Sequence, residues 1–239
     1  MVKCDLVELV GSERSALESL RKGVVGCRKC KRLVTYVSKV SRDKVRRYRD
    51  WRYWGRPLPG FGDPHARLLI IGLAPAAHGG NRTGRMFTGD SSGDWLIKAL
   101  YETGFSNQPT SISNDDGLEL TSAYITAAIR CAPPRNRPLA DEIKNCSEYL
   151  LEELQLLDQV EIALTLGRVA FDTYMRYAIP KDQRRKGRFG HGGFLEFDGL
   201  PSLMTSYHPS RQNTQTGRLT WEMWISIFRQ IRERLAESR

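Results

Sequence analysis

The sequence predicts an α/β fold in which helices cover both faces of a parallel sheet. Short apolar runs alternate with segments of helical length along most of the chain, starting with RLLIIGL at residues 67–73. This alternation is typical of parallel sheets, because each parallel connection needs a crossover segment. Ligands bind such folds outside the carboxyl ends of the strands. The polar loops after residues 73, 130 and 206 are therefore the expected positions of a functional site.

The chain begins with two segments of helical character. Apolar residues spaced through residues 6–20 predict an amphipathic helix, and three valines at near-helical spacing between residues 34 and 40 predict another. A turn-rich stretch at residues 55–62 then leads into the main fold.

Four strands and four helices are expected beyond that stretch. Residues 67–73 form the first strand, and residues 92–103 form a helix capped by a serine and stopped by Gly104. The remaining elements, in chain order, are strand 123–130, helix 141–157, strand 161–166, helix 168–177, strand 203–206 and helix 218–235.

The length and composition fit a single domain that spans residues 1–239. Of the 239 residues, 40% are hydrophobic, and the mean hydropathy is −0.45. The longest apolar run is roughly half the length that a bilayer requires, which excludes a membrane-spanning protein. Acidic residues near the N-terminus and the lack of an apolar stretch there argue against a signal peptide, so we expect a cytoplasmic protein.

Positive charge is concentrated near the N-terminus. The chain has 37 Lys and Arg and 27 Asp and Glu, a net charge of +10. Residues 21–56 hold 14 basic and two acidic side chains, a net of +12, interleaved with Tyr48, Trp51, Tyr53 and Trp54. Such a segment suits a nucleic acid, because phosphates attract the cations and bases or sugars pack on the rings. The alternative is a solvated basic helix whose aromatic residues pack inward.

Four of the five cysteines form two pairs. Cys27 and Cys30 make a CxxC motif, and Cys131 and Cys146 follow about 100 residues later. Four thiolates suit zinc or an iron–sulfur cluster, and the spacing alone does not choose between them. A disulfide framework is disfavoured in a chain without an export signal. Free buried cysteines are the remaining alternative.

The three polar loops carry residue types that suit a nucleic-acid ligand. Residues 72–90 contain five glycines, two arginines and Phe87, and three prolines stiffen residues 130–138 around Asn136. Residues 206–218 are polar and place His208 directly after a strand. Glycines let a ligand approach the backbone, and arginines can contact phosphates. A flexible glycine loop and a structural histidine are the corresponding alternatives.

These loops resemble the uracil-DNA glycosylase superfamily, in particular its type B, or family 5, enzymes. The similar stretches are GLAPAAHGGNRTGRMFTGD (72–90), YITAAIRCAPPRNRP (124–138) and SYHPSRQNTQTGR (206–218), with the four cysteines at the family's spacing. The resemblance implies a three-layer α/β/α fold with a central four-stranded parallel sheet. It also implies a four-iron four-sulfur (4Fe-4S) cluster on Cys27, Cys30, Cys131 and Cys146 that ties the basic helical segment to the core.

The activity that the resemblance implies is hydrolysis of the N-glycosidic bond of a flipped base in DNA, which leaves an abasic site. Phe87 would stack on the base, and His208 would donate a hydrogen bond to a base oxygen, the electrostatic contribution expected to matter most. Asn136 would orient the attacking water, with Asp90 as a candidate base. The expected base-pocket residues are Gly72, Leu73, Ala74, Pro75, Ala76, His78 and Phe87; the expected DNA contacts are Arg82, Arg85, Arg211, Gln212, Asn213 and Arg218.

Three departures from the superfamily pattern bear on this chemistry. Residues 74–76 are Ala-Pro-Ala where most relatives carry a polar or acidic residue that orients water, so activation falls to Asn136 or Asp90. Several relatives have an asparagine that hydrogen-bonds uracil at the position of Ala127. A pocket without that side chain discriminates poorly against other bases of similar shape. Hydroxymethyluracil, ethenocytosine and hypoxanthine are therefore expected substrates beside uracil. The third loop lacks a leucine wedge, so residues 211–213 are expected to fill the gap left by the flipped base.

Two other interpretations compete with a monomeric DNA glycosylase. One is a non-catalytic module on the same fold that binds damaged DNA or RNA, and turnover distinguishes it from an enzyme. The other is a zinc-bearing RNA-processing protein, which lacks the visible absorption of an iron–sulfur cluster.

Overall fold

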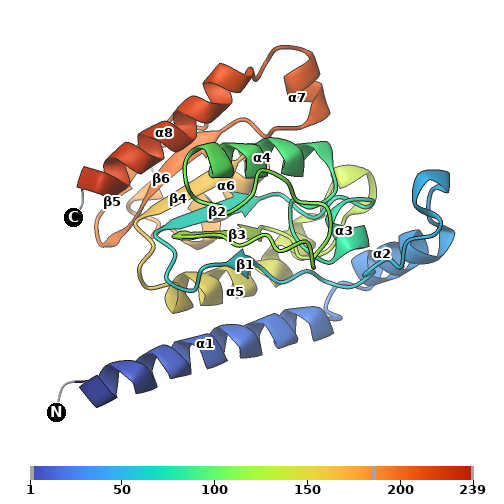
Figure 1. Ribbon diagram of the computed structural model, residues 1–239, viewed down its shortest axis with the longest axis horizontal. Helices are drawn as coiled ribbons and strands as arrows, with labels where there is room; N and C mark the ends of the chain where they lie inside the picture. Colours follow the sequence, from blue (N-terminus) through green and yellow to red (C-terminus); the bar gives the residue numbers. More distant parts are fainter. Residues whose placement is uncertain (1–2, 185–186, 238–239) are drawn as a thin grey trace.

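The computed structural model of the protein describes residues 3–184 and 187–237, built around a six-stranded sheet (Figure 1). The strand order is β1-β3-β2-β4-β6-β5. The four inner strands are parallel, and the two edge strands run antiparallel to their neighbours. The strands are β1 Phe61–Gly62, β2 Leu68–Gly72, β3 Ala123–Ala127, β4 Ile162–Leu166, β5 Phe194–Phe197 and β6 Leu200–Ser206.

The expectation of four strands is corrected by the two edge strands. β1 has two residues and lies at the end of the turn-rich stretch, where no strand pattern is visible. β5 has one buried residue, in contrast to the fully buried β2, β3 and β4. Both strands thus lack the continuous apolar run that identifies an inner parallel strand.

Helices cover both faces of the sheet, as predicted. Leu68 and Ile70 of β2 pack in the same apolar core as α4 and α8, whereas Leu69 and Ile71 pack with α5, α6 and part of α1. Successive side chains of a strand point to opposite faces, so one apolar strand serves two helical layers. These layers lie above and below the sheet in Figure 1. The helices are α1 Lys3–Gly26, α2 Lys31–Asp43, α3 Gly80–Thr83, α4 Ser91–Glu102, α5 Ala140–Leu156, α6 Arg168–Tyr177, α7 Arg211–Gln215 and α8 Trp221–Glu237, with 3-10 turns η1 Arg46–Tyr48 and η2 Pro134–Asn136.

The boundaries of the main helices agree with the sequence analysis to within a few residues. α6 begins and ends where predicted, whereas α8 begins at Trp221, three residues later than expected. The N-cap of α4 is Asp90 and not a serine: its carboxylate accepts hydrogen bonds from the backbone N–H groups of Ser92 and Gly93. Because residue 90 was expected to be a candidate base, this cap bears directly on the site.

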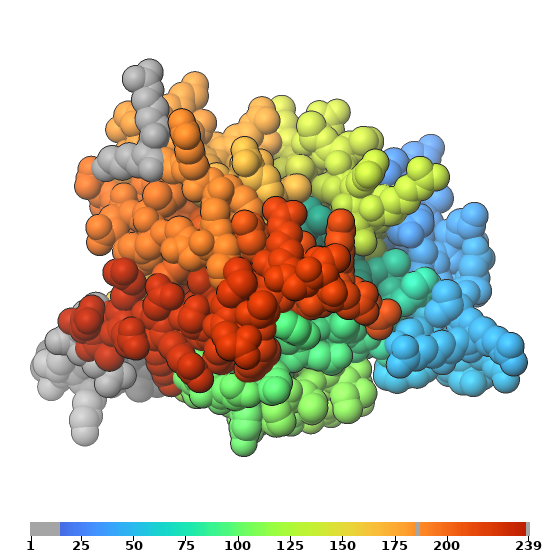
Figure 2. Space-filling view, turned by 90° about the horizontal axis from the view of Figure 1, so that it is seen from above, coloured from blue at the N-terminus to red at the C-terminus, as the bar shows by residue number. Residues whose placement is uncertain are grey.

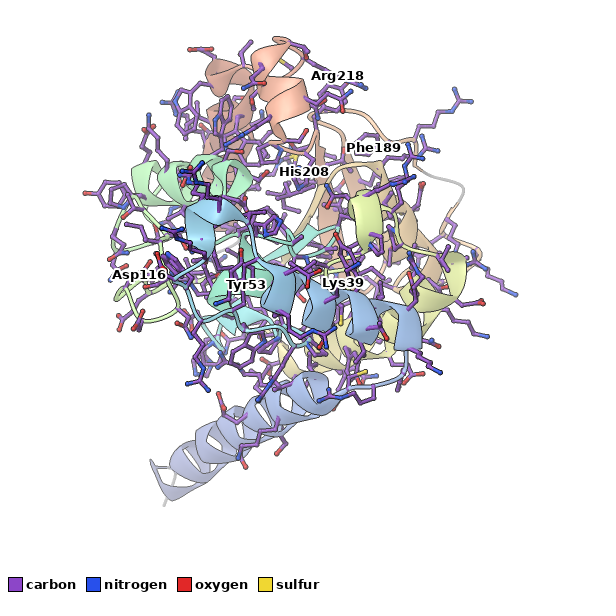
Figure 3. The ribbon with its side chains drawn as sticks, turned by 90° about the vertical axis from the view of Figure 1, so that its right-hand side faces the viewer. Lys39, Tyr53, Asp116, Phe189, His208 and Arg218 are labelled. Atoms are coloured by element: carbon purple, nitrogen blue, oxygen red, sulfur yellow. The ribbon has the colours of Figure 1, made fainter. Side chains whose placement is uncertain are left out.

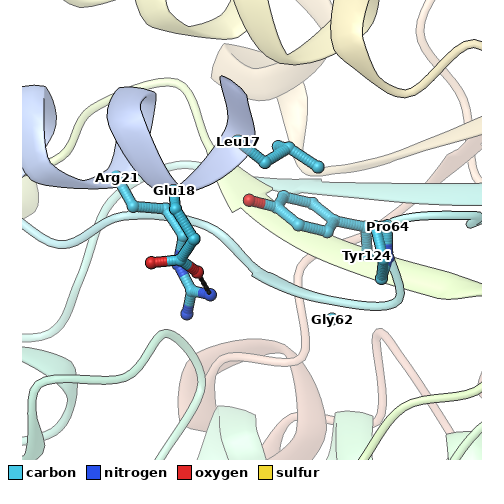
Figure 4. A pocket seen from close by; sticks show the side chains of 6 residues that line it. All are labelled: Leu17, Glu18, Arg21, Gly62, Pro64 and Tyr124. Carbon is cyan, nitrogen blue, oxygen red and sulfur yellow. Dashed lines mark hydrogen bonds and ion pairs between the residues drawn. The ribbon is translucent and has the colours of Figure 1, made fainter. Parts of the chain in front are cut away.

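The N-terminal helices pack outside the three layers. Leu17, Leu20 and Val24 of α1 and Leu33 and Val37 of α2 are buried. A pocket of about 240 Å³ lies between α1 and the β1–β3 edge (Figure 4). No helix among the described residues is long and apolar enough to cross a membrane.

A buried ion pair joins the end of β3 to α5. Arg130 donates to both carboxylate oxygens of Glu153 at 3.0 and 2.6 Å, and the Thr126 hydroxyl donates to the same carboxylate at 2.6 Å. The Arg130 and Glu153 side chains are 1% and 2% exposed. Because both charges are desolvated, such an ion pair stabilises a folded protein little more than an apolar pair of similar size would. Loss of one partner is costly, because it leaves an uncompensated buried charge.

Glu153→Ala is therefore expected to lower the free energy of unfolding by about 3–5 kcal/mol. Urea unfolding followed by circular dichroism measures this loss. The double variant Arg130→Met/Glu153→Leu is the control, because it removes both charges and should recover most of the stability. A loss below about 1 kcal/mol in Glu153→Ala, the size of an exposed pair, would contradict the assignment.

Candidate active site

The carboxyl ends of the parallel strands lie at one edge of the sheet. Gly72 at the end of β2 pairs in register with Ala127 of β3, and Leu166 of β4 pairs with Ser206 of β6. Beyond the strands, the N–H of Ala128 donates to the Gly72 carbonyl at 2.9 Å. The three polar loops therefore start side by side, as the α/β prediction requires. Figure 3 shows the molecule from this side, with His208 labelled.

Phe87 and His208 face each other at this edge. Their ring centroids are 6.0 Å apart and their planes differ by 30°. Gly72 is needed beneath the ring, because a Cβ there would lie 2.8 Å from Phe87. Both rings remain partly exposed. The first and third loops thus bring together the two residues expected to contact a flipped base.

Left-handed backbone conformations occur in the first two loops. Phe87 has a φ of 50°, and Arg135 and Asn136 each have a φ of 55°. Such conformations cost free energy in residues other than glycine and concentrate at functional sites. Arg135 and Asn136 are exposed, so burial does not explain their strained backbone.

A cavity of about 470 Å³ opens among the three loops. Ala76 and His78 of the first loop line it, together with Asp90 where that loop ends. Asn136 enters from the second loop and Arg211 from the third. The structure thus brings both candidate water-activating residues into one cavity. Phe87 and His208 are not among its lining residues; they form the neighbouring pair described above.

Three cavity residues come from the basic N-terminal segment, and of these the sequence had singled out only Tyr48. Tyr36 of α2 and Arg47 and Tyr48 of η1 line the same cavity. In Figure 2 the light-blue surface of this segment stands at one end of the molecule, beyond the green first loop. The basic and aromatic composition identified the segment, but only the fold shows which of its side chains reach the site.

Asp90 combines a structural role with a position in the cavity. Its Oδ1 accepts the N–H groups of Ser92 and Gly93, each at 3.0 Å. A Cβ at Gly79 would collide with Oδ2, so this glycine is required for the approach of the loop. Burial raises the pKa of Asp90, although the two backbone hydrogen bonds oppose that shift. The carboxylate is therefore more basic than an ordinary aspartate, which suits a general base.

His208 is held as a neutral imidazole. Burial lowers its pKa to about 4, well below the ordinary 6.5. Its carbonyl accepts from the Asn213 amide at 2.8 Å, and Gly167 packs against its Cβ side. The preceding residue, Tyr207, donates its N–H to His191 Nδ1 at 3.3 Å. A neutral ring at neutral pH can still donate one N–H hydrogen bond.

Two predicted DNA contacts are buried in the protein instead. Arg82 is 3% exposed; it donates to the carbonyls of His78 and Gly89, and its guanidinium lies 4.0 Å from the ring centroids of both Tyr48 and Trp51. This contact fastens the basic segment to the first loop. Direct phosphate contact by Arg82 is therefore corrected to an internal role.

Arg85 is likewise internal. It is 7% exposed and donates to Asp116 at 2.7 and 2.8 Å and to the Ser111 hydroxyl at 2.9 Å. Its charge is paired with the Asp116 carboxylate inside the protein, so Arg85 is not available to contact a phosphate. A run of glycines and arginines does not show from sequence alone which way each arginine points.

The third-loop residues have different environments. Arg211, Gln212 and Arg218 are exposed, and the Arg218 guanidinium lies 4.7 Å from the Tyr207 ring centroid. The Asn213 side chain instead binds the His208 carbonyl, which engages it within the protein.

The remaining predicted base-pocket residues form the start of the first loop. The Leu73 carbonyl accepts the Ile129 N–H at 3.0 Å, Pro75 is buried and Ala74 packs towards the cysteines. His78 Nδ1 lies 3.0 Å from the Tyr53 hydroxyl. These contacts hold the backbone of the first loop rigidly at the site.

The four predicted cysteine ligands converge near α2. Cys30 packs against the apolar cluster that contains Cys131 and Cys146, and Cys27 lies three residues before Cys30. Cys131 and Cys146 are buried with Leu33 and Val37 of α2, and all four cysteines are free. Among the described residues, no group of three or more His, Cys, Asp or Glu meets the geometry of a single metal-ion site.

The fold and the cavity define an α/β protein whose ligand binds at the carboxyl edge of a parallel sheet. The sequence model of the uracil DNA glycosylase superfamily matches residues 59–232. A type-5 uracil-DNA glycosylase of Pyrobaculum aerophilum is 47% identical over 206 residues, which cover 86% of this chain and 88% of that relative. A type-5 enzyme of Thermus thermophilus is 46% identical over 212 residues, covering 88% and 94%. A type-4 enzyme of Sulfurisphaera tokodaii is 30% identical over 154 residues, covering 64% and 55%.

The chain belongs to the uracil-DNA glycosylase superfamily and, within it, to the type-5 enzymes. It is a DNA-repair glycosylase that excises uracil, a hydrolase of N-glycosidic bonds, as the sequence analysis predicted.

Proposed function

We propose that the cavity between the three loops receives the nucleotide rotated out of the duplex, and that water attacks its sugar there. The observation that carries this proposal is the meeting of Asp90 and Asn136, from separate loops, in one cavity beside the Phe87–His208 pair. A base inside a duplex cannot reach such a cavity without flipping, at a cost of a few kcal/mol.

The residues divide the chemical work between the two separating parts of the nucleotide. As the glycosidic bond breaks, positive charge develops on the sugar and negative charge on the leaving base. Asn136 orients the attacking water, and Asp90, with its raised pKa, accepts the water's proton. His208 donates its N–H to the base oxygen where the negative charge develops. Phe87 provides the stacking surface.

We further propose that Cys27, Cys30, Cys131 and Cys146 hold a 4Fe-4S cluster. Three of the four thiols, from three separate segments, pack in one apolar cluster, and Cys27 completes the CxxC pair with Cys30, which suits a sulfur-ligated centre. When bound, the group ties α2 and the basic segment to the second loop. It supplies no step of the hydrolysis, so the proposed role is structural.

Visible absorption and iron content distinguish this cluster from zinc. Protein purified without oxygen is expected to be brown and to contain about four irons per chain. The Cys131→Ala variant should lose the colour. Its solubility and its affinity for DNA should fall more than its single-turnover rate. Colourless wild-type protein with one zinc per chain would contradict the proposal.

The pocket is also proposed to accept several bases. Ala127 at the end of β3 is 1% exposed and brings no polar group to the base-binding edge. Sites that reject substrates strongly do so with buried hydrogen-bonding groups that a wrong substrate leaves unpaired.

A substrate panel tests this breadth. Uracil should be excised fastest. The excision rates of hydroxymethyluracil, ethenocytosine and hypoxanthine should lie within about 100-fold of the uracil rate, because no buried polar group discriminates among the bases more strongly. Ala127→Asn should widen the gap between uracil and hypoxanthine. Strict uracil specificity of the wild type would show that another group reads the base.

Three expectations stay predictions: a monomer, a single domain over residues 1–239 and a cytoplasmic location.

A further inference from the structure

The segment between α4 and β3 is bonded to the first loop. The N–H of Gly89 donates to the Ser111 carbonyl at 2.8 Å, and the hydroxyls of Thr88 and Ser111 lie 2.6 Å apart. Arg85 donates to the same Ser111 hydroxyl at 2.9 Å. This segment therefore keeps a fixed position relative to Asp90.

Asp116 organises the tip of the segment. Its carboxylate accepts the N–H groups of Ile112, Ser113 and Leu118 at 2.7, 3.2 and 3.1 Å. Arg85 donates to both of its oxygens. A loop whose backbone N–H groups are held by one carboxylate in this way has a fixed conformation (Asp116 is labelled in Figure 3).

This stiff tip presents an isoleucine to solvent. Ile112 is 60% exposed, more than any other large hydrophobic residue in 15–184 and 187–237, where Leu139 follows at 55% and Tyr101 at 47%. Exposed apolar surface is unfavourable in water. The hydrogen bond from the Ile112 N–H to Asp116 fixes the backbone at this position, with the residue largely in solvent.

Ile112 also lines a cavity that adjoins the proposed active site. This cavity has a volume of about 320 Å³ and shares Arg47, Asp90 and Arg211 with the active-site cavity. Arg47 and Arg211 are exposed, and Asp94 lies on the same wall. An apolar side chain that shares a cavity with two exposed arginines complements duplex DNA, in which phosphates flank the stacked bases.

We propose that Ile112 is the apolar wedge of this enzyme: it enters the duplex where the flipped nucleotide leaves a gap, while Arg47 and Arg211 contact the flanking phosphates. The inference rests on the proposed flipping of the nucleotide. It takes the place of gap filling by Asn213, whose side-chain amide is engaged by the His208 carbonyl, and it assigns Arg211 to a phosphate. Apolar side chains act in this way in proteins that unstack and kink DNA.

The test compares uracil excision from duplex and single-stranded DNA under single-turnover conditions. Ile112→Ser should slow excision from the duplex about tenfold or more, because the gap is left unfilled, and change single-strand excision by less than about twofold. Ile112→Leu should keep the duplex rate. Tyr101→Ser, which removes another exposed hydrophobic side chain, is the control and should change neither rate.

A fluorescent adenine analogue placed opposite the uracil reports the gap without turnover. Its fluorescence on protein binding should differ between wild type and Ile112→Ser. An equal loss on both substrates, or no loss on either, would overturn the wedge. If the wild type excises uracil from neither substrate, that result contradicts the proposed function, and the wedge proposal that rests on it is overturned as well.

Discussion

His208→Ala is expected to slow single-turnover excision of uracil about 100- to 1,000-fold, the usual cost of removing one donor to a developing oxyanion. The imidazole is stacked with Phe87, and the backbone carbonyl of His208 is held by Asn213. Duplex affinity should change by less than about threefold, because phosphate contacts dominate it. His208→Gln, which keeps a neutral donor, should recover part of the rate. A loss smaller than about tenfold in His208→Ala would contradict the assignment.

The pH dependence follows from the pKa of about 4 that burial gives His208. The ring stays neutral from pH 8 down to about pH 4, so His208 contributes no loss of rate near pH 6.5. Its folded pKa lies below the ordinary value, so between about pH 4 and 6.5 the unfolded chain binds more protons. Stability therefore falls as the pH is lowered through this range. In His208→Gln that part of the acid destabilisation should disappear, as thermal unfolding at several pH values would show.

The second large effect is expected at Asp90. Asp90→Asn should slow single-turnover excision about 100-fold or more, within the range for loss of a general base. Because its pKa is raised by burial, the wild-type rate should fall with acid at a higher pH than an ordinary aspartate would give. That acid limb should be absent in Asp90→Asn.

Matched variants separate this catalytic role from the capping role. Asparagine is also a good N-cap, so Asp90→Asn should keep the stability of α4, whereas Asp90→Ala should lose about 0.5–2 kcal/mol. Asn136→Ala should slow the reaction without unfolding, since that side chain is exposed. Full single-turnover rates in both Asp90→Asn and Asn136→Ala would show that water is activated by another group.

The inner strands were predictable because their chemistry is local. Mostly apolar runs of five residues between helical segments specify buried parallel strands, and all five residues of β2, β3 and β4 are buried. The edge strands β1 and β5 were not predictable, because they are short and only partly buried. The cap of α4 was also not predictable. Asp90 and Ser91 are adjacent and both are good N-cap residues, so only the backbone dihedrals show that Asp90 caps the helix.

The site was predictable as three loops but not in its details. Parallel strands place their carboxyl ends together, so Asp90 and Asn136 could be expected at one edge. The direction of each arginine depends on long-range partners: Arg85 turns inward to Asp116, and Arg82 inserts between two rings of a segment far away in sequence. A single sequence contains no information on such pairings, so both residues were expected to contact phosphate.

In the proposed mechanism, Asp90 and Asn136 activate the attacking water in this cavity in place of a polar residue at 74–76. The most direct measurement is a single-turnover assay on an end-labelled duplex with one deoxyuridine, followed by alkali, for the wild type and the Asp90→Asn/Asn136→Ala double variant. We expect strand scission at the deoxyuridine by the wild type and almost none by the double variant, with duplex binding retained. Equal scission by both proteins would contradict it.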